Sequence, residues 1–286
     1  MLKSKTSRWL AGPYLLWMAI FTVVPLVIVV WYAMTNTDGQ FTLDNLTQIG
    51  RYSSVFARSL ILAAISTVVC LVMAFPVGYF LSRLRANKQH IMLMLIMLPM
   101  WMNFLLRTYA WMSILENTGL LNRFFSAIGL IDLVNGILGT NMTHFNMINT
   151  PGAVVLGMVY NFLPFMILPI HSVIQKIDRN LIEAAQDLGS NNYHVFTKVI
   201  FPLSLPGVLS GITMVFVPAV STFAISKLLG GSKELLLGDL IEIQFLGSAY
   251  NPHLGSAISL VMMLIVVICM VVMNRFGEGE ETAVML

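Results

Sequence analysis

Six long stretches of this chain contain no aspartate, glutamate, lysine or arginine, and they constrain its fold more than any other feature. A lone charge is costly in hydrocarbon, and a helix needs about 20 residues to cross a bilayer core of roughly 30 Å. The uncharged stretches are residues 9–37, 59–82, 89–106, 133–175, 199–226 and 243–274. This pattern predicts a polytopic membrane protein.

The composition favours the same class. Of the 286 residues, 57% are hydrophobic and 10% are charged, against roughly 45–50% and 25% in ordinary soluble domains, and the mean hydropathy is +0.82. Such a chain is too apolar for intrinsic disorder. Two cysteines are too few for a secreted disulfide scaffold. A net charge of +3 is too small to indicate nucleic-acid binding.

Trimming the polar ends of these stretches predicts an all-α fold with six transmembrane helices. The third helix is the least regular, because it must include Arg107 to reach full length. The first follows basic residues, as a secretory signal does, but its apolar run is about twice the usual length of a signal, so we expect it to stay uncleaved. The predicted spans are residues 13–34, 60–82, 91–115, 152–173, 205–226 and 256–275.

The distribution of lysine and arginine predicts the orientation. Ten lie on one side of the predicted spans and six on the other, and the richer side faces the cytoplasm. The short connection with Arg83, Arg85 and Lys88 is purely basic, which is where this rule works best. We therefore expect a cytoplasmic-membrane protein with a transmembrane domain over 13–275 and cytoplasmic tails at 1–12 and 276–286.

The connection between the third and fourth spans contains an amphipathic segment. Its apolar residues recur at helical spacing, opposite Asn122 and Arg123, which predicts a short helix lying on the membrane surface. The apolar residues are Leu120, Leu121, Phe124, Phe125, Ile128 and Ile131.

The connection between the fourth and fifth spans differs from the other loops. Asn180 is a good helix N-cap and Glu183 follows three residues later, which is the capping-box arrangement. Gly189 suits the left-handed position that ends a helix. A second helix is expected to begin directly after this glycine and to end before Pro202. The predicted shape is two short helices joined by a bend.

This loop resembles the EAA loop of ABC importer permeases. It reads Glu183-Ala-Ala-Gln-Asp-Leu-Gly189, followed by Phe201-Pro-Leu-Ser-Leu-Pro-Gly207. Residues 98–109, 163–169 and 228–239 further resemble the spermidine/putrescine branch of these permeases. Together the similar segments cover the chain from about 13 to 275.

The resemblance implies the six-helix fold of type I ABC importer permeases and a role as half of a translocation pathway for a polyamine. It also implies partners: a second, non-identical permease subunit, two cytoplasmic ATP-binding subunits, and an external substrate-binding protein. The chain has no phosphate-binding loop of its own, the nearest fragment being Gly230-Gly-Ser-Lys233. We therefore expect a transport subunit that is not an enzyme, with no cofactor, whose ATP is bound by partner chains.

The resemblance further implies that the loop over about 176–207 couples to the ATPase. Small Ala184 and Ala185 permit close approach of two backbones, while Glu183 and Asp187 lie one helical turn apart and fix the register through charge. The alternative is that Glu183 only completes a cap and Asp187 faces water. The implied coupling residues are Glu183, Ala184, Ala185, Asp187, Leu188, Gly189, Pro206 and Gly207.

None of the thirteen acidic residues lies inside a predicted span. Ion-coupled secondary carriers usually place an ionisable residue inside the membrane, so this absence disfavours that class. A polycation crossing here would meet aromatic faces and amide oxygens, with about 0.5–2 kcal/mol per cation–ring contact. The candidate path residues are Trp101, Asn103, Tyr109, Trp111, Tyr160 and Asn161.

Arg107 has two interpretations. Either it faces the path and pairs with an acid from the outer loops, or its side chain snorkels toward the membrane interface. The acids Glu116, Asp239 and Glu242 are candidates for receiving an incoming cation, although surface solvation explains each of them equally.

Pro164 and Pro169 predict an irregular fourth span, which is either a pathway or hinge element or a packing kink. Pro218 has the same two interpretations in the fifth span.

Several alternatives stay open or are disfavoured. One alternative within the same family is a permease for another small solute, such as a phosphonate or another anion, for which Arg107 makes better sense. An ion-coupled carrier lacks its intramembrane acid, and a membrane-embedded enzyme lacks a catalytic cluster. The five histidines are scattered and have no partner at metal-ligand spacing, so no metal is expected.

Overall fold

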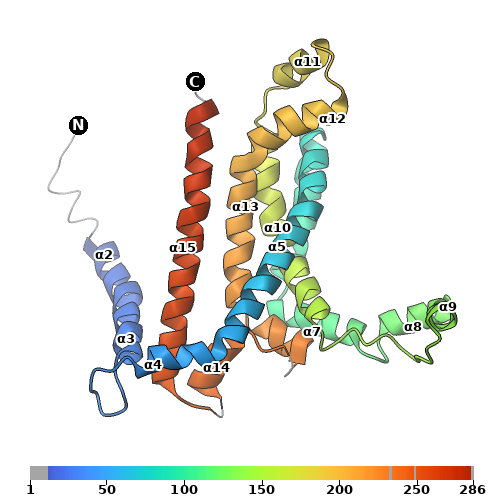
Figure 1. The fold of residues 1–286 in the computed structure, drawn as a ribbon. Helices are drawn as coiled ribbons and strands as arrows, with labels where there is room; N and C mark the ends of the chain where they lie inside the picture. The colour runs from blue at the N-terminus through green and yellow to red at the C-terminus, as the bar shows by residue number, and fades with distance from the viewer. Residues whose placement is uncertain (1–11, 232–233, 248, 285–286) are drawn as a thin grey trace, which may run out of the picture. The chain divides into compact units, whose positions relative to one another are not determined.

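The computed structural model describes residues 12–231, 234–247 and 249–284, which are mainly helical (Figure 1). Among these residues the only β-type pairing is an isolated bridge between Thr35 and Phe41. The chain forms two compact units, one of residues 1–54 with 240–265 and one of residues 55–239 with 266–286. The predicted all-α fold is confirmed.

Five described helices are long and apolar enough to cross a membrane, and a sixth span results if one bent pair counts as a single crossing. The five are Gly12–Ala33, Asp44–Ser82, Pro151–Ile174, Asn192–Ser221 and Pro252–Met273. The bent pair is Ala86–Trp101 with Phe104–Ala127, at an angle of 88°. A continuous third helix over 91–115 is therefore wrong. The chain extends at Met102, and Asn103 then caps a new helix.

The first unit begins with a helix built from α2 (Gly12–Met18), η1 (Ala19–Val23) and α3 (Val24–Ala33). A turn leads to α4 (Asp44–Gln48) and η2 (Ile49–Tyr52). The buried Asn45 amide donates to the carbonyls of Ala33 and Thr35, at 3.2 and 3.0 Å, and holds this turn closed. The unit also contains most of α14 (Leu237–Leu246) and the first half of α15 (Pro252–Val284).

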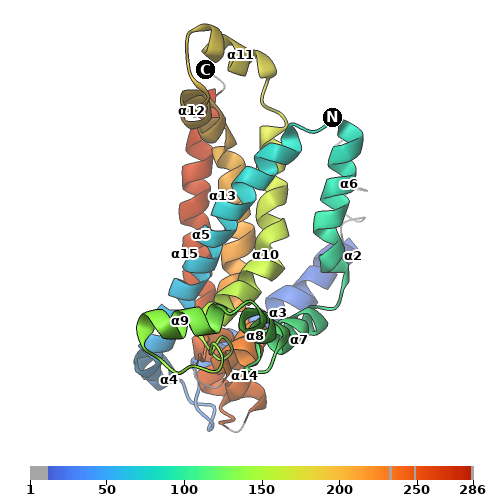
Figure 2. The ribbon, with the colours of Figure 1, turned by 90° about the vertical axis from the view of Figure 1, so that its right-hand side faces the viewer.

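The core of the second unit lies between α10 (Pro151–Ile174), α13 (Phe201–Ser221) and most of α5 (Ser53–Ser82). Figures 1 and 2 both show α10 and α13 side by side. Their backbones approach closely at Gly207, where a Cβ atom would lie 2.8 Å from the Pro169 carbonyl oxygen. The buried Met158, Met166 and Ile170 of α10 fill this core, and their burial drives the packing.

The prolines do not interrupt these helices. Pro164 and Pro169 lie inside the single helix α10, and Pro218 lies inside α13, so the predicted irregular fourth span is not observed. The chain is helical from Asn192 to Ser221, and the predicted end before Pro202 is also wrong. Pro202 occupies the first turn of α13, directly after the π-helix η4 (Phe196–Ile200). The wider π-helical turn directly before Pro202 lets the helix continue through a residue that has no amide hydrogen to donate.

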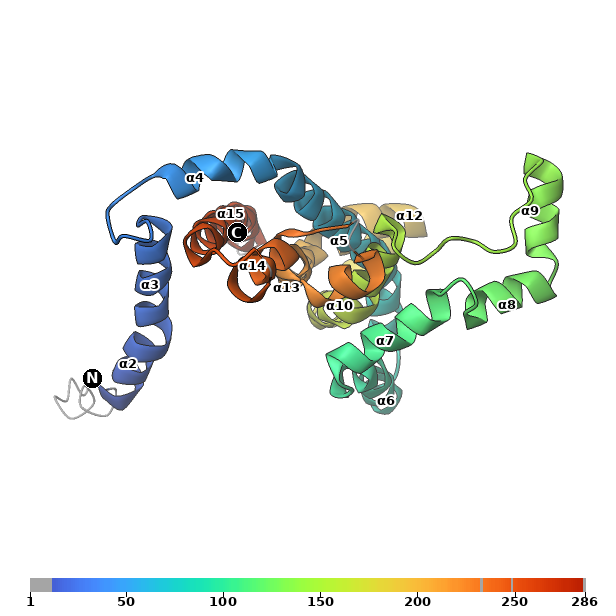
Figure 3. The ribbon, with the colours of Figure 1, turned by 90° about the horizontal axis from the view of Figure 1, so that it is seen from below.

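The second unit also contains α6 (Ala86–Met97), η3 (Leu98–Trp101), α7 (Phe104–Leu115), α8 (Leu120–Ala127) and α9 (Leu130–Leu138). Figure 3 shows α7 and α8 leading away from α10 and α13 to α9. Asn122 is buried and bonds the backbone of Phe145 in both directions. Leu120, Phe124 and Ile128 stay exposed. An amphipathic helix is present, but it is shorter than predicted, because Gly129 with φ of +72° ends it and Ile131 is buried in α9. Its place on the membrane surface stays a prediction.

Candidate functional site

The first helix of the predicted coupling loop is α11 (Arg179–Asp187). Its N-cap is Asp178, whose Oδ1 accepts a hydrogen bond from the Asn180 amide at 3.0 Å. The prediction of Asn180 as the cap, with Glu183 completing a capping box, is therefore wrong. Aspartate and asparagine cap helices equally well, and the earlier start adds two residues to a short helix.

The helix ends as predicted. Gly189 has φ of +81°, its amide donates to the Gln186 carbonyl at 2.9 Å, and the Ser190 amide donates to the Ala185 carbonyl at 3.1 Å. This pair of bonds is the Schellman motif, which needs a residue in the left-handed region. Asn191 then caps the next helix, α12 (Asn192–Val195).

One side of α11 is apolar and exposed. Leu181, Ala184 and Leu188 follow at three- and four-residue spacing, which places them on one face, and the Leu181 and Leu188 side chains are 51% and 88% exposed. We call these three residues the coupling face. Ala184 and Leu188 belong to the predicted set, whereas Leu181 was missed because a leucine in a short amphipathic helix normally faces inward.

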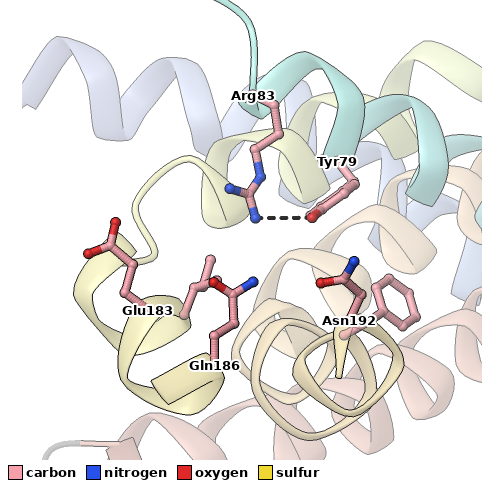
Figure 4. A pocket seen from close by; sticks show the side chains of 7 residues that line it. Tyr79, Arg83, Glu183, Gln186 and Asn192 are labelled. Atoms are coloured by element: carbon pink, nitrogen blue, oxygen red, sulfur yellow. Dashed lines mark hydrogen bonds between the residues drawn. The ribbon is translucent and has the colours of Figure 1, made fainter. Parts of the chain in front are cut away.

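The opposite side of α11 borders a cavity of about 560 Å³ (Figure 4). It is lined by Glu183 and Gln186 of α11, Asn192 of α12, Tyr79 of α5 and Arg83 directly after α5, together with Ile182 and Phe196. The Arg83 Nη2 donates to the Tyr79 hydroxyl at 3.0 Å, and the guanidinium lies 5.0 Å from the centre of that ring. Glu183 therefore lines a cavity shared with the end of α5, while exposed Asp187 borders the coupling face.

Aromatic contacts fasten the loop to α5. The Phe196 ring of η4 meets Phe75 edge-on with 5.4 Å between centroids, and it meets Tyr79 at 6.4 Å. Such edge-to-face pairs contribute about 0.5–1.5 kcal/mol beyond their buried area. The π-helix η4 is therefore held directly against α5, while α11 stands at the end of the bundle (Figure 1).

The motif's final pair lies elsewhere. Pro206 and Gly207 are part of α13, and Gly207 is buried against Pro169 and Val173 of α10. Their position favours a packing role between helices over direct contact with a partner.

Two candidate path residues meet in the structure. The Trp111 ring of α7 packs edge-on against the Tyr160 ring of α10, with 5.3 Å between centroids. Neighbouring Asn161 is buried, and its Nδ2 donates to the Gly157 carbonyl at 2.8 Å. Its Oδ1 is buried without a hydrogen-bond partner among the described residues. Trp101 and Tyr109, in contrast, are exposed.

Asn103 caps α7 at the break in the third span. Its Oδ1 accepts hydrogen bonds from the amides of Leu105 at 2.8 Å and Leu106 at 3.4 Å. We expect Asn103→Ala to destabilise the purified protein by about 1 kcal/mol, measured by thermal unfolding in detergent. Asn103→Ser, which keeps an acceptor at the cap, is the matched control. Equal stability of the two variants would contradict the capping role.

Arg107 is buried within the chain. Its side chain is only 9% exposed, the guanidinium lies 6.0 Å from the centre of the Phe104 ring, and Nε is buried without a hydrogen-bond partner among the described residues. A buried guanidinium inside a membrane protein is costly unless it is compensated. Among the described residues, Arg107 is the one buried lysine or arginine.

The three external acids differ in exposure. Glu116 is exposed, and Glu242 on α14 is half-buried. Asp239 is buried, and its Oδ2 accepts from the Leu236 amide at 2.9 Å. Of the three, Glu116 is the most accessible to an incoming cation. No group of three His, Cys, Asp or Glu side chains arranged for a metal occurs within the described ranges.

The sequence from residue 1 to 278 matches the family described as binding-protein-dependent transport system inner membrane component. The chain belongs to this family. Its curated relatives include the spermidine/putrescine transport system permease protein PotB of Escherichia coli K12, which is 36% identical over 91% of this chain and 93% of that protein. The protein of the same name from Haemophilus influenzae is 36% identical over 92% and 91%.

Solved structures agree on the fold of this family member. A bacterial ABC transporter that imports the acidic polysaccharide alginate contains a chain that superposes with a TM-score of 0.78, at 14% identity, over 96% of this chain and 95% of that chain. A chain of the methionine ABC transporter MetNI superposes with a TM-score of 0.55, at 16% identity, over 82% and 98%. These likenesses identify the fold of a binding-protein-dependent permease.

Proposed function

We propose that this family member is the permease subunit of an ATP-driven importer and forms half of the translocation pathway for a polyamine. It is a multi-pass protein of the cytoplasmic membrane, and it works with a second permease subunit, cytoplasmic ATPases and an external binding protein. The similarity to two spermidine/putrescine permeases over nine-tenths of the chain carries this assignment. The absence of a phosphate-binding loop in the sequence agrees with a separate ATPase.

The coupling face is the surface that contacts the ATPase. Two large apolar side chains exposed on a short helix are unfavourable in water and are suited to a groove on a partner. The charge of Asp187 beside this face fixes its register, whereas Glu183 lines the cavity on the opposite side of α11. Because the loop must meet a cytoplasmic partner, both chain termini are proposed to lie in the cytoplasm, as the lysine and arginine distribution predicts.

The path is proposed to run past the break in the third span. Trp101, Asn103 and Tyr109 lie at or after that break, and the Trp111–Tyr160 pair joins α7 to the core helix α10. Their aromatic faces and amide oxygens attract a polycation without trapping it. Asn161 supplies a further amide oxygen, and Glu116, Glu242 and Asp239 are proposed to receive the cation outside.

A second solute class has one observation in its favour. The buried guanidinium of Arg107 repels a polycation and would favour an anion such as a phosphonate. The competition arm of the uptake experiment separates the two classes.

The test is uptake of labelled spermidine by vesicles that contain the chain with its partner subunits and binding protein. We expect uptake that requires ATP, that stops with a hydrolysis-deficient ATPase, and that persists when the proton gradient is collapsed. Unlabelled putrescine should compete and a phosphonate should not.

Three outcomes would contradict the proposal. Uptake that survives the inactive ATPase but depends on the proton gradient would indicate a secondary carrier. Competition by the phosphonate alone would indicate the anion. Labelling of a Tyr193→Cys variant only from outside the cell would place the coupling loop on the wrong side.

A further inference from the structure

Helix α6 has one buried residue, and that residue is polar. Of its twelve residues, all of them described, only Gln89 is buried, whereas the apolar Ile91, Met94 and Leu95 are exposed. Buried amides are unfavourable unless they are hydrogen-bonded. The position of α6 against the rest of the second unit therefore depends on what Gln89 contacts.

Gln89 bonds two residues at the end of α10. Its Nε2 is hydrogen-bonded to Nε2 of His171, and its Oε1 accepts from the Gln175 amide at 3.4 Å. A glutamine amide carries a donor and an acceptor, and a histidine ring nitrogen serves as either according to its tautomer, so the two side chains are complementary. We call Gln89, His171 and Gln175 the α6–α10 junction.

The partners in α10 are themselves firmly placed. His171 is buried, and Gly78 of α5 packs so closely that a Cβ there would lie 3.4 Å from the His171 amide nitrogen. Gln175 is the C-cap of α10, and the N-cap of α11 follows at Asp178. Figure 2 shows α6 beside this end of α10. The junction thus joins α6 to the segment that leads directly into the coupling helix.

A second cavity places the coupling helix next to the junction. It has a volume of about 180 Å³ and is lined by Gln89 of α6, Gln175 at the end of α10, and Ile182 of α11, among others. At its far end α6 continues through η3 into the break at Met102 and Asn103. One helix therefore connects the surroundings of α11 with the proposed translocation path.

From this arrangement we infer that Gln89 and His171 are positioning residues that transmit movement of the coupling loop to the broken third span. This inference rests on the proposed function and supplies it with a route from the coupling helix to the proposed path. When the ATPase displaces α11, the end of α10 moves with it. The junction passes that displacement to α6, which moves the Met102–Asn103 break and the path residues beside it.

The test measures solute transported per ATP hydrolysed in vesicles that contain the full complex. Gln89→Leu and His171→Leu should each lower this ratio at least fivefold while the ATPase rate stays within twofold of the unmodified complex. The double variant Gln89→His/His171→Gln, called the swap variant, exchanges the two side chains, so a donor and an acceptor still face each other. It should regain at least half of the transport ratio of the unmodified complex. His90→Leu, an exposed histidine in the same helix, is the matched control and should change nothing.

A second measurement reports movement directly. With Met102→Cys, which is exposed at the break, maleimide labelling should change at least threefold between the nucleotide-free and the vanadate-trapped complex. Adding Gln89→Leu should abolish that change, and adding His90→Leu should preserve it.

Two results would overturn the inference. One is that the single leucine variants keep the transport ratio, and the other is that an assembled swap variant is as uncoupled as the single leucine variants. Failure of the unmodified complex to take up polyamine would instead count against the proposed function. In that case the labelling measurement still tests the junction, because it needs no transported solute.

Discussion

Leu188→Asp should lower ATP-driven uptake at least tenfold without unfolding the chain. The Leu188 side chain is 88% exposed, so its replacement removes almost no buried apolar area from this chain. In the docked complex, however, a carboxylate would be taken out of water against an apolar groove, and an unpaired interface charge costs about 2–5 kcal/mol. A factor of ten corresponds to about 1.4 kcal/mol, so tenfold is a lower bound.

Co-purification with the ATPase and stimulation of ATP hydrolysis measure this effect directly. Leu181→Asp, on the same face, should lower both co-purification and ATPase stimulation as Leu188→Asp does. Asn180→Asp adds the same charge to the first turn of the same helix, where a negative charge is favourable, and should leave both measurements unchanged. Normal co-purification of both leucine variants would place the ATPase contact elsewhere.

Gly189→Pro should have the other large effect. The native φ of +81° is closed to proline, which requires about −65°, and the substitution also removes the amide that donates to Gln186 at 2.9 Å. Strain and lost bonding together should exceed about 3 kcal/mol, which is more than a hundredfold in a conformational equilibrium. We expect the coupling helix to lose its position, and uptake to fall below a tenth of the uptake by the unmodified complex.

The control is Gly189→Asn, because asparagine tolerates the left-handed region better than other side chains. No added Cβ atom would meet a neighbour within 4 Å at this position. The asparagine variant should retain most of the uptake and most of the ATPase stimulation. If the proline variant retains as much as the asparagine variant, the bend at Gly189 does not position the coupling helix.

The sequence predicted the features that depend on local chemistry. Long uncharged stretches have few stable alternatives to membrane-spanning helices, so the all-α class and most of the spans are confirmed. Gly189 was identified correctly because few other residues adopt the left-handed region without strain. The family was identified from the spacing of the coupling motif, and the comparison with its members confirms it.

Predictions failed where two local choices had nearly equal free energy. Asp178 and Asn180 are both good caps, and the structure uses the first. Pro202 ends a helix in some contexts and opens one in others, and here it occupies the first turn of α13. The break at Asn103 was missed because, in the sequence, an asparagine that caps a helix inside an apolar run looks the same as a polar residue tolerated within a continuous helix.

The sequence by itself determined the helical class, the coupling motif and its glycine bend, because hydropathy and backbone preferences act within a few residues. Tertiary structure alone decided that Leu181 is exposed, that Arg107 is buried, and that Gln89 meets His171 from 82 residues away. Exposure and pairing depend on which helices pack together, and that free energy is a sum over distant contacts that no local pattern records.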